Sequence, residues 1–197
     1  MNNITLASQS LARKKILQDA GIVFRAIASI VDEQSEKTHL LADGATPADI
    51  AEALARAKAL DVAAHTPGWV IGADQTLEFE GVTYDKVANL AEARERLAML
   101  SGHVHLLQTA TAVAREGEIV WQKLVTCRLT MRQVSDAYLD AYLDRNMPGI
   151  LSSVGCYQVE GEGVQLFEDM RGGYFNIMGL SVLELFSFLR GEGVLQR

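Results

Sequence analysis

Apolar and polar positions alternate in short blocks at the start of the chain. Residues 4–7, mostly apolar, have the length of a short strand. Ser10 is a typical helix N-cap, apolar Ile16 and Leu17 follow it, and Gly21 is a typical residue after a helix end. The opening of the chain therefore predicts a strand, a tight turn and a helix.

A second helix is predicted from Thr46 to about residue 64. Thr46 supplies a capping hydroxyl, Pro47 fits the first helical position, and Asp49 supplies a carboxylate three residues after the cap. This combination is typical of a helix start.

The next apolar run, residues 69–73, has the length and composition of a buried strand. It is expected to place Asp74 at its C-terminal end. Residues 77–84 turn at Glu80 and Gly81, and this pattern predicts a hairpin.

The second half of the chain continues the alternation. It predicts helices over 91–100, from Ser135 to near Pro148, and over 183–189. It also predicts two paired strands, 104–114 and 119–129, joined by a turn at 115–118, and a glycine-rich bend between 154–159 and 164–167. The chain is therefore expected to form an α/β fold, with a mixed twisted sheet and flanking helices, in a single domain of residues 1–197.

The composition and charge of the chain limit the classes of binding partner that are expected. The chain has 197 residues, is 49% hydrophobic and carries a net charge of −7. A basic face is needed to bind a nucleic-acid polymer, so no such partner is expected, whereas a small anion needs only a local group of donors. No apolar run approaches the roughly 18 residues of a membrane span, and the start lacks a signal-peptide pattern, so a cytoplasmic protein is expected.

Cysteine usage excludes two further classes of site. Cys127 and Cys156 are the two cysteines, and their spacing fits neither a disulfide framework nor a zinc site. Both are expected to be buried as small hydrophobic residues.

The first candidate for chemistry is the predicted turn and helix start around Ser8, Ser10 and Arg13. Unpaired N–H groups at a helix start favour anions, and an arginine can bind phosphate oxygens through two hydrogen bonds. The segment therefore suits a phosphate group. The alternative is that Ser10 only caps the helix while Arg13 and its neighbours Lys14 and Lys15 are solvated.

The second candidate is a pair of carboxylates. Asp74 follows a buried strand, and Glu33 lies with Asp32 in a loop after residues 30–31. An oxygen-only set of Glu33 and Asp74 suits Mg²⁺ or Mn²⁺, and Asp74 can also take a proton from water. The alternatives are an aspartate that only forms a turn and an ordinary acidic loop.

Two lysines form the third candidate. Ile50, Leu54 and Lys58 succeed one another at four-residue spacing, which places Lys58 on the expected buried side of its helix. A buried lysine needs a partner, and an ion pair with Asp61 or a lysine that reaches out to solvent would satisfy that need without any function. Lys86, just past the predicted hairpin, is either a site residue or a solvated loop residue.

In this order and spacing, the segments resemble the Maf family of nucleotide pyrophosphatases over nearly the whole chain. Three positions depart from the family pattern: Leu11-Ala12 stands where the family has Pro-Arg, and Val87 where it has proline. The segments that carry the resemblance are Leu6-Ala7-Ser8-Gln9-Ser10 with Arg13, Val31-Asp32-Glu33, Ala57-Lys58-Ala59, Gly72-Ala73-Asp74, Lys86, Leu100-Ser101-Gly102, Gly155-Cys156-Tyr157, Glu160-Gly161 and Asn176-Ile177-Met178-Gly179-Leu180.

The resemblance implies a Maf/ITPase-like fold with a central cleft. It also implies hydrolysis of a nucleoside triphosphate between its α- and β-phosphates, a homodimer, and Mg²⁺ or Mn²⁺ held by Asp74 and Glu33. The residue roles it implies are catalysis by Asp74, Lys58, Lys86 and Glu33, and substrate binding by Ser8, Ser10, Arg13, Ala12, Gln75 and Glu160. Gln75 and Glu160 resemble the branch that acts on 7-methyl-GTP. The alternative function is a non-catalytic, nucleotide-binding regulator of septum formation and cell division.

Overall fold

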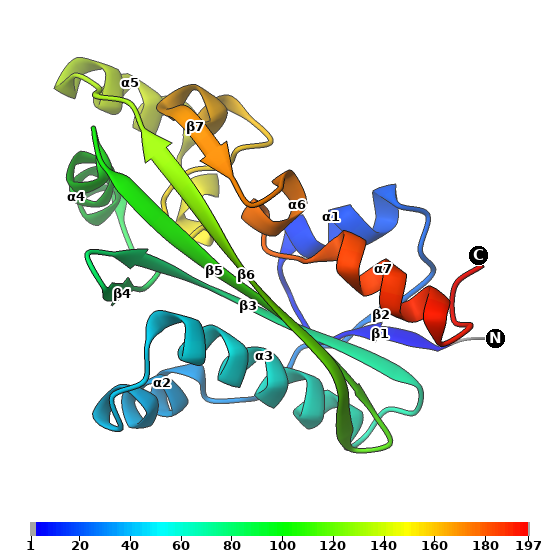
Figure 1. The fold of residues 1–197 in the computed structure, drawn as a ribbon. Coiled ribbons are helices and arrows are strands. Elements are labelled where there is room, and N and C mark those ends of the chain that lie inside the picture. The colour runs from blue at the N-terminus through cyan, green and yellow to red at the C-terminus, as the bar shows by residue number, and fades with distance from the viewer. Residues whose placement is uncertain (1–2, 197) are drawn as a thin grey trace.

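The computed structural model describes residues 3–196, and strands in that range form one mixed sheet of seven strands (Figure 1). The sheet order is β2-β1-β3-β5-β6-β7, with β4 also paired to β3. β1 runs parallel to β2 and β3, whereas the other pairs are antiparallel, so the predicted mixed sheet is confirmed. The strands are β1 (Ile4–Leu6), β2 (Arg25–Ala26), β3 (Trp69–Phe79), β4 (Val82–Tyr84), β5 (Val104–Arg115), β6 (Glu118–Met131) and β7 (Phe167–Arg171).

Helices flank the sheet on both sides (Figure 1). α2 and α3 lie on one side of the long strands, α1, α6 and α7 lie on the other, and α4 and α5 lie toward one end. No helix within residues 3–196 is long and apolar enough to cross a membrane. The helical elements are α1 (Leu11–Asp19), α2 (Glu33–Ala42), α3 (Pro47–Ala63), α4 (Leu90–Leu100), α5 (Asp136–Asn146), α6 (Tyr174–Ile177) and α7 (Val182–Gly191), with short 3-10 turns η1 (Gly149–Ser152) and η2 (Glu162–Leu166).

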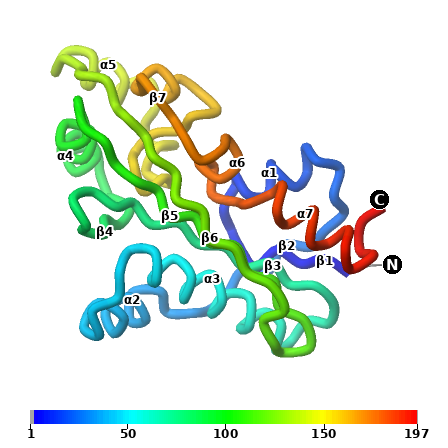
Figure 2. The backbone as a smooth tube through the Cα atoms, in the orientation of Figure 1, coloured from blue at the N-terminus to red at the C-terminus, as the bar shows by residue number. Residues whose placement is uncertain are grey.

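The two faces of β3 pack differently. Ala55 and Ala59 of α3 pack against Val70 and the alanines of β5, and these small side chains let the helix approach the sheet closely. On the opposite face, Ile71 packs with α1, β1 and α7. Figure 2 shows both ends of the described chain beside β1 and α7. The hydrophobic core on this face of β3 therefore joins elements from the start and the end of the chain.

Local sequence signals for the helices and turns are confirmed. The hydroxyls of Ser10, Thr46 and Ser135 each accept a backbone N–H and cap α1, α3 and α5. Glu80 and Gly81 both adopt positive φ, as the two-residue hairpin turn between β3 and β4 requires. Both cysteines are buried and free, as expected.

Two boundary predictions were wrong. β3 does not stop before Asp74, because its antiparallel pairing with β5 runs from Val70 to Glu78 without interruption. Asp74 therefore lies in the middle of a strand rather than at its end. Glu33 begins α2 rather than lying in a loop, and Asp32 caps that helix. α2 buries none of its residues, so it has no apolar periodicity from which it could be predicted.

Candidate active site

The site lies where one edge of β3 loses its strand partners. β1 pairs with residues 69–71 of this edge and β4 pairs with residues 77–79. Among the described residues, no strand pairs with the stretch between them on that side. This gap lies just beyond the carboxyl end of β1, and ligands of α/β proteins bind beyond the carboxyl ends of parallel strands.

Asp74 lies in this gap and binds a buried lysine. The Nζ of Lys58 is 2.7 Å from Oδ1 of Asp74 and 2.9 Å from Oε1 of Glu33. Lys58 and Asp74 are both buried, whereas Glu33 is exposed. The predicted alternative of a Lys58–Asp61 ion pair is wrong, because the Asp61 carboxylate accepts hydrogen bonds from the loop ahead of α2 and Lys58 pairs with the other two carboxylates.

Gly72 allows α3 to bring Lys58 to Asp74. A Cβ atom at Gly72 would lie 2.2 Å from the Ala55 carbonyl oxygen and 2.7 Å from the Ala59 amide nitrogen. Both are backbone atoms of α3, in the turns next to Lys58. Because alternate residues of a strand face the same side, Gly72 and Asp74 both face α3. The missing side chain thus sets the distance between the lysine and the carboxylate.

Arg13 reaches the same gap from α1. Its Nε donates to the Gly179 carbonyl oxygen at 2.8 Å, and its Nη1 donates to Oγ of Ser8 at 3.3 Å. Burial lowers the pKa of Arg13, whereas Asp74 and Glu33 act to raise it. Gly179 adopts a φ of +97°, a backbone conformation that favours glycine. The carbonyl oxygen that accepts from Arg13 belongs to this same residue. The alternative of a solvated Arg13 is wrong, because its guanidinium binds Gly179 and Ser8.

Lys86 follows β4 and completes the group. Burial lowers its pKa, as do the charges of Arg13 and Lys58, while Glu33 and Asp74 raise it. The charges of Arg13, Lys58, Glu33 and Asp74 therefore all act on Lys86, and Lys58 contacts both carboxylates directly. Three cations face two carboxylates there, so the site has a positive balance within a chain of net charge −7.

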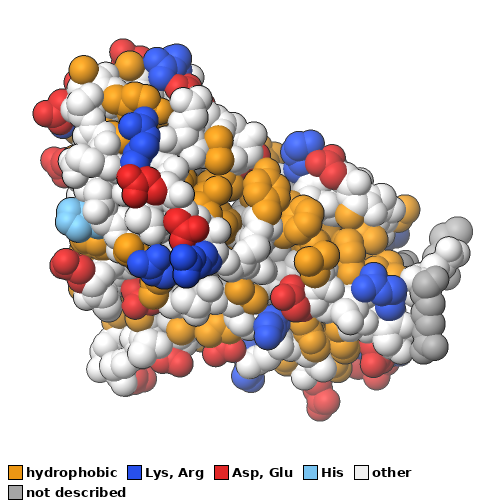
Figure 3. Space-filling model, turned by 45° about the horizontal axis from the view of Figure 1, so that its top comes forward, with side chains coloured by type: hydrophobic (Ala, Val, Ile, Leu, Met, Phe, Trp, Pro, Cys, Tyr) orange, Lys and Arg blue, Asp and Glu red, His pale blue; other side chains and the backbone are white. Residues whose placement is uncertain are grey.

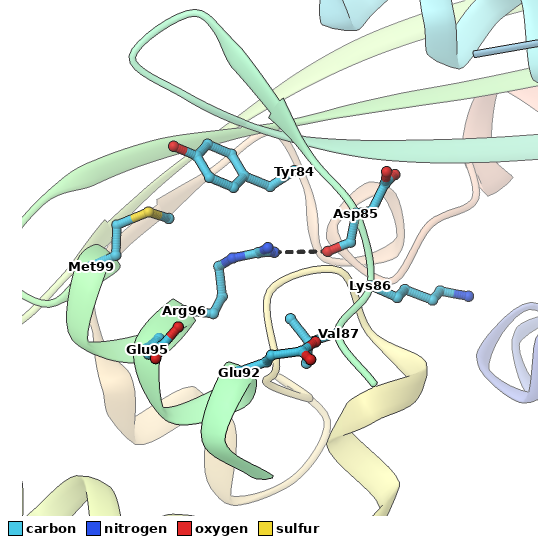
Figure 4. A pocket seen from close by; sticks show the side chains of 8 residues that line it. All are labelled: Tyr84, Asp85, Lys86, Val87, Glu92, Glu95, Arg96 and Met99. Atoms are coloured by element: carbon cyan, nitrogen blue, oxygen red, sulfur yellow. Dashed lines mark hydrogen bonds between the residues drawn. The ribbon is translucent and has the colours of Figure 1, made fainter. Parts of the chain in front are cut away.

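A cavity of about 420 Å³ adjoins the segment that carries Lys86. In Figure 4 the Lys86 side chain extends away from Arg96 and Met99. The lining residues are Tyr84, Asp85, Lys86, Val87, Glu92, Glu95, Arg96 and Met99.

The other residues predicted to bind substrate, Gln75 apart, lie around the start of α1 and before η2, and within residues 3–196 none of them forms a hydrogen bond or ion pair with Asp74. Ser8 and Ser10 accept hydrogen bonds within the turn, so their hydroxyls shape the start of α1 and orient Arg13. Ala12 is half-buried in α1. Glu160 is exposed before η2, and its carboxylate makes no hydrogen bond or ion pair within residues 3–196.

Gln75 lies on the face of β3 opposite Asp74. Its Nε2 donates to Oγ1 of Thr109 at 2.7 Å and to the carbonyl oxygens of Asn176 and Ile177 at 3.0 and 3.1 Å. The amide N–H groups are thus used inside the protein to hold α6. The adjacent Gly179 carbonyl binds Arg13, so Gln75 is linked to the site through α6.

The two carboxylates suit a hard divalent cation. Asp74 and Glu33 both lie against the Lys58 ammonium, which shows that they converge on one positive charge. Residues 3–196 contain no group of three or more His, Cys, Asp or Glu side chains able to hold a metal ion. Magnesium is commonly bound through one or two carboxylates together with substrate phosphates and water, so the pair fits that mode.

Three residues near the site were not predicted from the sequence. Lys37 of α2 forms an ion pair with Asp85, the neighbour of Lys86. Arg96 of α4 donates to the carbonyl oxygen of Asp85 at 3.0 Å. The spacing of Glu33 and Lys37, one helical turn apart after the capping residue Asp32, was an available signal for α2.

Comparison with known proteins supports the resemblance stated above. The family profile described as "Maf-like protein" matches residues 3–192. A "Nucleoside triphosphate pyrophosphatase" of Caulobacter vibrioides is 50% identical over 192 residues, which cover 98% of this chain and 96% of the relative. A "7-methyl-GTP pyrophosphatase" of Rhizobium meliloti is 44% identical over 193 residues and 98% and 97% of the two chains. A match of this extent and identity shows that the chain belongs to the Maf family.

Proposed function

We propose that this protein hydrolyses a nucleoside triphosphate between its α- and β-phosphates and releases a nucleoside monophosphate and pyrophosphate. The convergence of Asp74 with Arg13, Lys58 and Lys86 at the open edge of β3 carries the proposal. Relatives of up to 50% identity named as nucleoside triphosphate pyrophosphatases support it.

In this proposal the three cations bind and stabilise the phosphates. Arg13 can donate hydrogen bonds to phosphate oxygens from the guanidinium N–H groups that Gly179 and Ser8 do not use. Lys58 and Lys86 add point charges where negative charge grows on the oxygens during phosphoryl transfer. Such charge stabilisation in a site shielded from water is the largest contribution in most enzymes of this type.

Asp74 is the proposed base. Its carboxylate is held by Lys58 on a rigid strand, so its direction is fixed, and it orients or deprotonates the water that attacks the α-phosphorus. Pyrophosphate is the leaving group. The bond between the α-phosphorus and the bridging oxygen breaks as the bond to the water oxygen forms.

Asp74 and Glu33 would hold a divalent metal, Mg²⁺ or Mn²⁺. When bound, such an ion neutralises phosphate charge and acts as a Lewis acid. Removal of divalent cations with a chelator is expected to abolish turnover, and their return is expected to restore it.

The proposed substrate includes 7-methyl-GTP. At least three relatives carry that name, one of them from Brucella abortus at 42% identity over 96% of each chain. Glu160 is exposed and unpaired within the described chain, so its carboxylate is free to accept from the N1–H and amino groups of a guanine and to offset the charge of a methylated ring. Glu160→Gln is expected to reduce the preference for 7-methyl-GTP over GTP.

The competing proposal is a nucleotide-binding regulator of septum formation that lacks catalysis. A binder needs the cations but has no use for a carboxylate directed at water. Incubation with a panel of canonical and modified triphosphates and Mg²⁺ or Mn²⁺ separates the two. Monophosphate and pyrophosphate support the enzyme, whereas binding without products supports the regulator. Light scattering tests the expected homodimer.

Asp74→Asn is the sharpest test of the assigned base. The amide keeps the shape of the side chain and can still accept from Lys58, so the fold is expected to persist while turnover falls at least a hundredfold, the lower range for loss of a general base (about 10²–10⁴). Pyrophosphate release near the wild-type rate by a folded variant would refute the role of Asp74.

A further inference from the structure

The Glu33 helix is held in place by charged contacts rather than by a hydrophobic core. Within the described chain, α2 buries none of its residues. Its side chains nevertheless make ion pairs at two points: Glu33 binds Lys58 of α3, and Lys37 binds Asp85 after β4. A helix attached in this way takes its position from those charges, because little apolar burial opposes its movement.

Both contacts come from one face of α2. Glu33 and Lys37 are four residues apart, and residues at this spacing are neighbours on a helix surface. One end of this face contacts the lysine that holds Asp74, and the other contacts the residue before Lys86. The helix thus joins the two lysines of the site across the open edge of β3.

Asp85, the partner of Lys37, is itself held in place by Arg96 of α4. The Nη1 of Arg96 donates to the Asp85 carbonyl oxygen at 3.0 Å and to the Val154 carbonyl oxygen at 2.7 Å. Its guanidinium also lies over the Tyr84 ring, 4.8 Å from the centroid. Figure 4 shows Arg96 reaching Asp85 from α4. Asp85 is therefore fixed through its backbone while its carboxylate is left to bind α2.

We infer that Lys37 and Asp85 are positioning residues whose ion pair holds α2 against the site and so sets Glu33 and Lys86 in their working places. The inference rests on the proposed function, because it assigns these two residues an effect on that reaction. Neither residue needs to touch the substrate. Loss of the pair displaces Glu33, the carboxylate proposed to hold the metal, and Lys86, the ammonium proposed to bind the phosphates.

Charge reversal tests the pair. Lys37→Glu and Asp85→Lys are each expected to lower kcat about tenfold, less than the roughly hundredfold cost of a fixed 1 Å misplacement. KM is expected to change less, because the interactions lost are those made in the transition state. The double variant Lys37→Glu/Asp85→Lys restores an opposite-charge pair and is expected to recover most of kcat.

The matched control is Arg94→Glu. Arg94 also joins two elements through exposed ion pairs, to Asp136 and Asp140 of α5, but none of these residues belongs to the site. This variant is expected to keep the wild-type kcat. Melting temperatures of all variants are expected to stay close to one another, since ion pairs with a solvent-exposed partner contribute little to stability.

Amide hydrogen exchange supplies a readout that does not depend on activity. Exchange over residues 33–42 is expected to be faster in each single variant and to return toward wild type in the double variant. Unchanged exchange, or a double variant no more active than the single ones, would overturn the inference. Were the wild-type protein inactive on every triphosphate, the proposed function would fail, and the exchange data would still decide whether the ion pair holds α2.

Discussion

Gly72→Ala tests whether the close packing of α3 on β3 controls the site. The added Cβ would lie 2.2 Å from the Ala55 carbonyl oxygen, whereas carbon contacts are relaxed at about 3.5 Å, so the helix or the strand must move by about 1 Å. The two nearest atoms, the Ala55 carbonyl oxygen and the Ala59 amide nitrogen, belong to the α3 backbone, which cannot rotate away as a side chain can. Because Lys58 lies on this helix, the movement separates its ammonium from Asp74.

Two magnitudes follow from this displacement. Overpacking of a well-packed core costs about 1–3 kcal/mol, and for a domain of this size each kcal/mol lowers the melting temperature by about 2–4 °C. A fall of about 2–12 °C is therefore expected. A misplacement of 1 Å at a catalytic group can cost about a hundredfold in rate, so kcat is expected to fall by that order.

The assay measures pyrophosphate release and thermal unfolding side by side. Gly191→Ala is the control, because a Cβ at that position of α7 meets nothing within 4 Å. The double variant Gly72→Ala/Asp74→Asn adds a second check, since residues that act as a unit show losses that do not add. A Gly72→Ala protein with the wild-type kcat and melting temperature would refute the argument that this glycine sets the Lys58–Asp74 distance.

Two further predictions concern buried groups. Lys58→Ala is expected to reduce turnover by a larger factor than its effect on the equilibrium for unfolding; equal losses in both measurements would indicate a purely structural ion pair. His105 is buried against Tyr157, and burial lowers its pKa to about 4. The unfolded chain binds this proton near pH 6.5, so the stability that depends on neutral His105 is complete above pH 6.5 and is lost as the pH falls toward 4, by about 3 kcal/mol in total. Urea unfolding of wild type and His105→Gln across this range measures the difference, and parallel pH dependences of the two proteins would contradict it.

Local structure was largely readable from the sequence. The cap at Thr46, the turn at Glu80 and Gly81, and the paired strands on either side of residues 115–118 depend on residues within a few positions of one another. Such local signals can be read from the sequence because they need no contact with a distant segment. The ordered motifs also indicated the family, because a catalytic set leaves its residue types at fixed places along the chain.

What the sequence by itself determined about this protein is its mixed α/β fold, the starts of α1, α3 and α5, its hairpin turns, and the identity of the charged residues at its candidate site. The tertiary structure alone decided how those residues meet. Lys58 binds Asp74, which is 16 residues away in the sequence, and Lys37 binds Asp85, which is 48 residues away. Arg13 binds the Gly179 carbonyl oxygen over a sequence separation of 166 residues. The position of α2 against the site depends on such contacts, and Gln75 proved to face away from Asp74. Local patterns encode backbone conformation, whereas ion pairs depend on which distant segments the packing of the sheet and helices brings together.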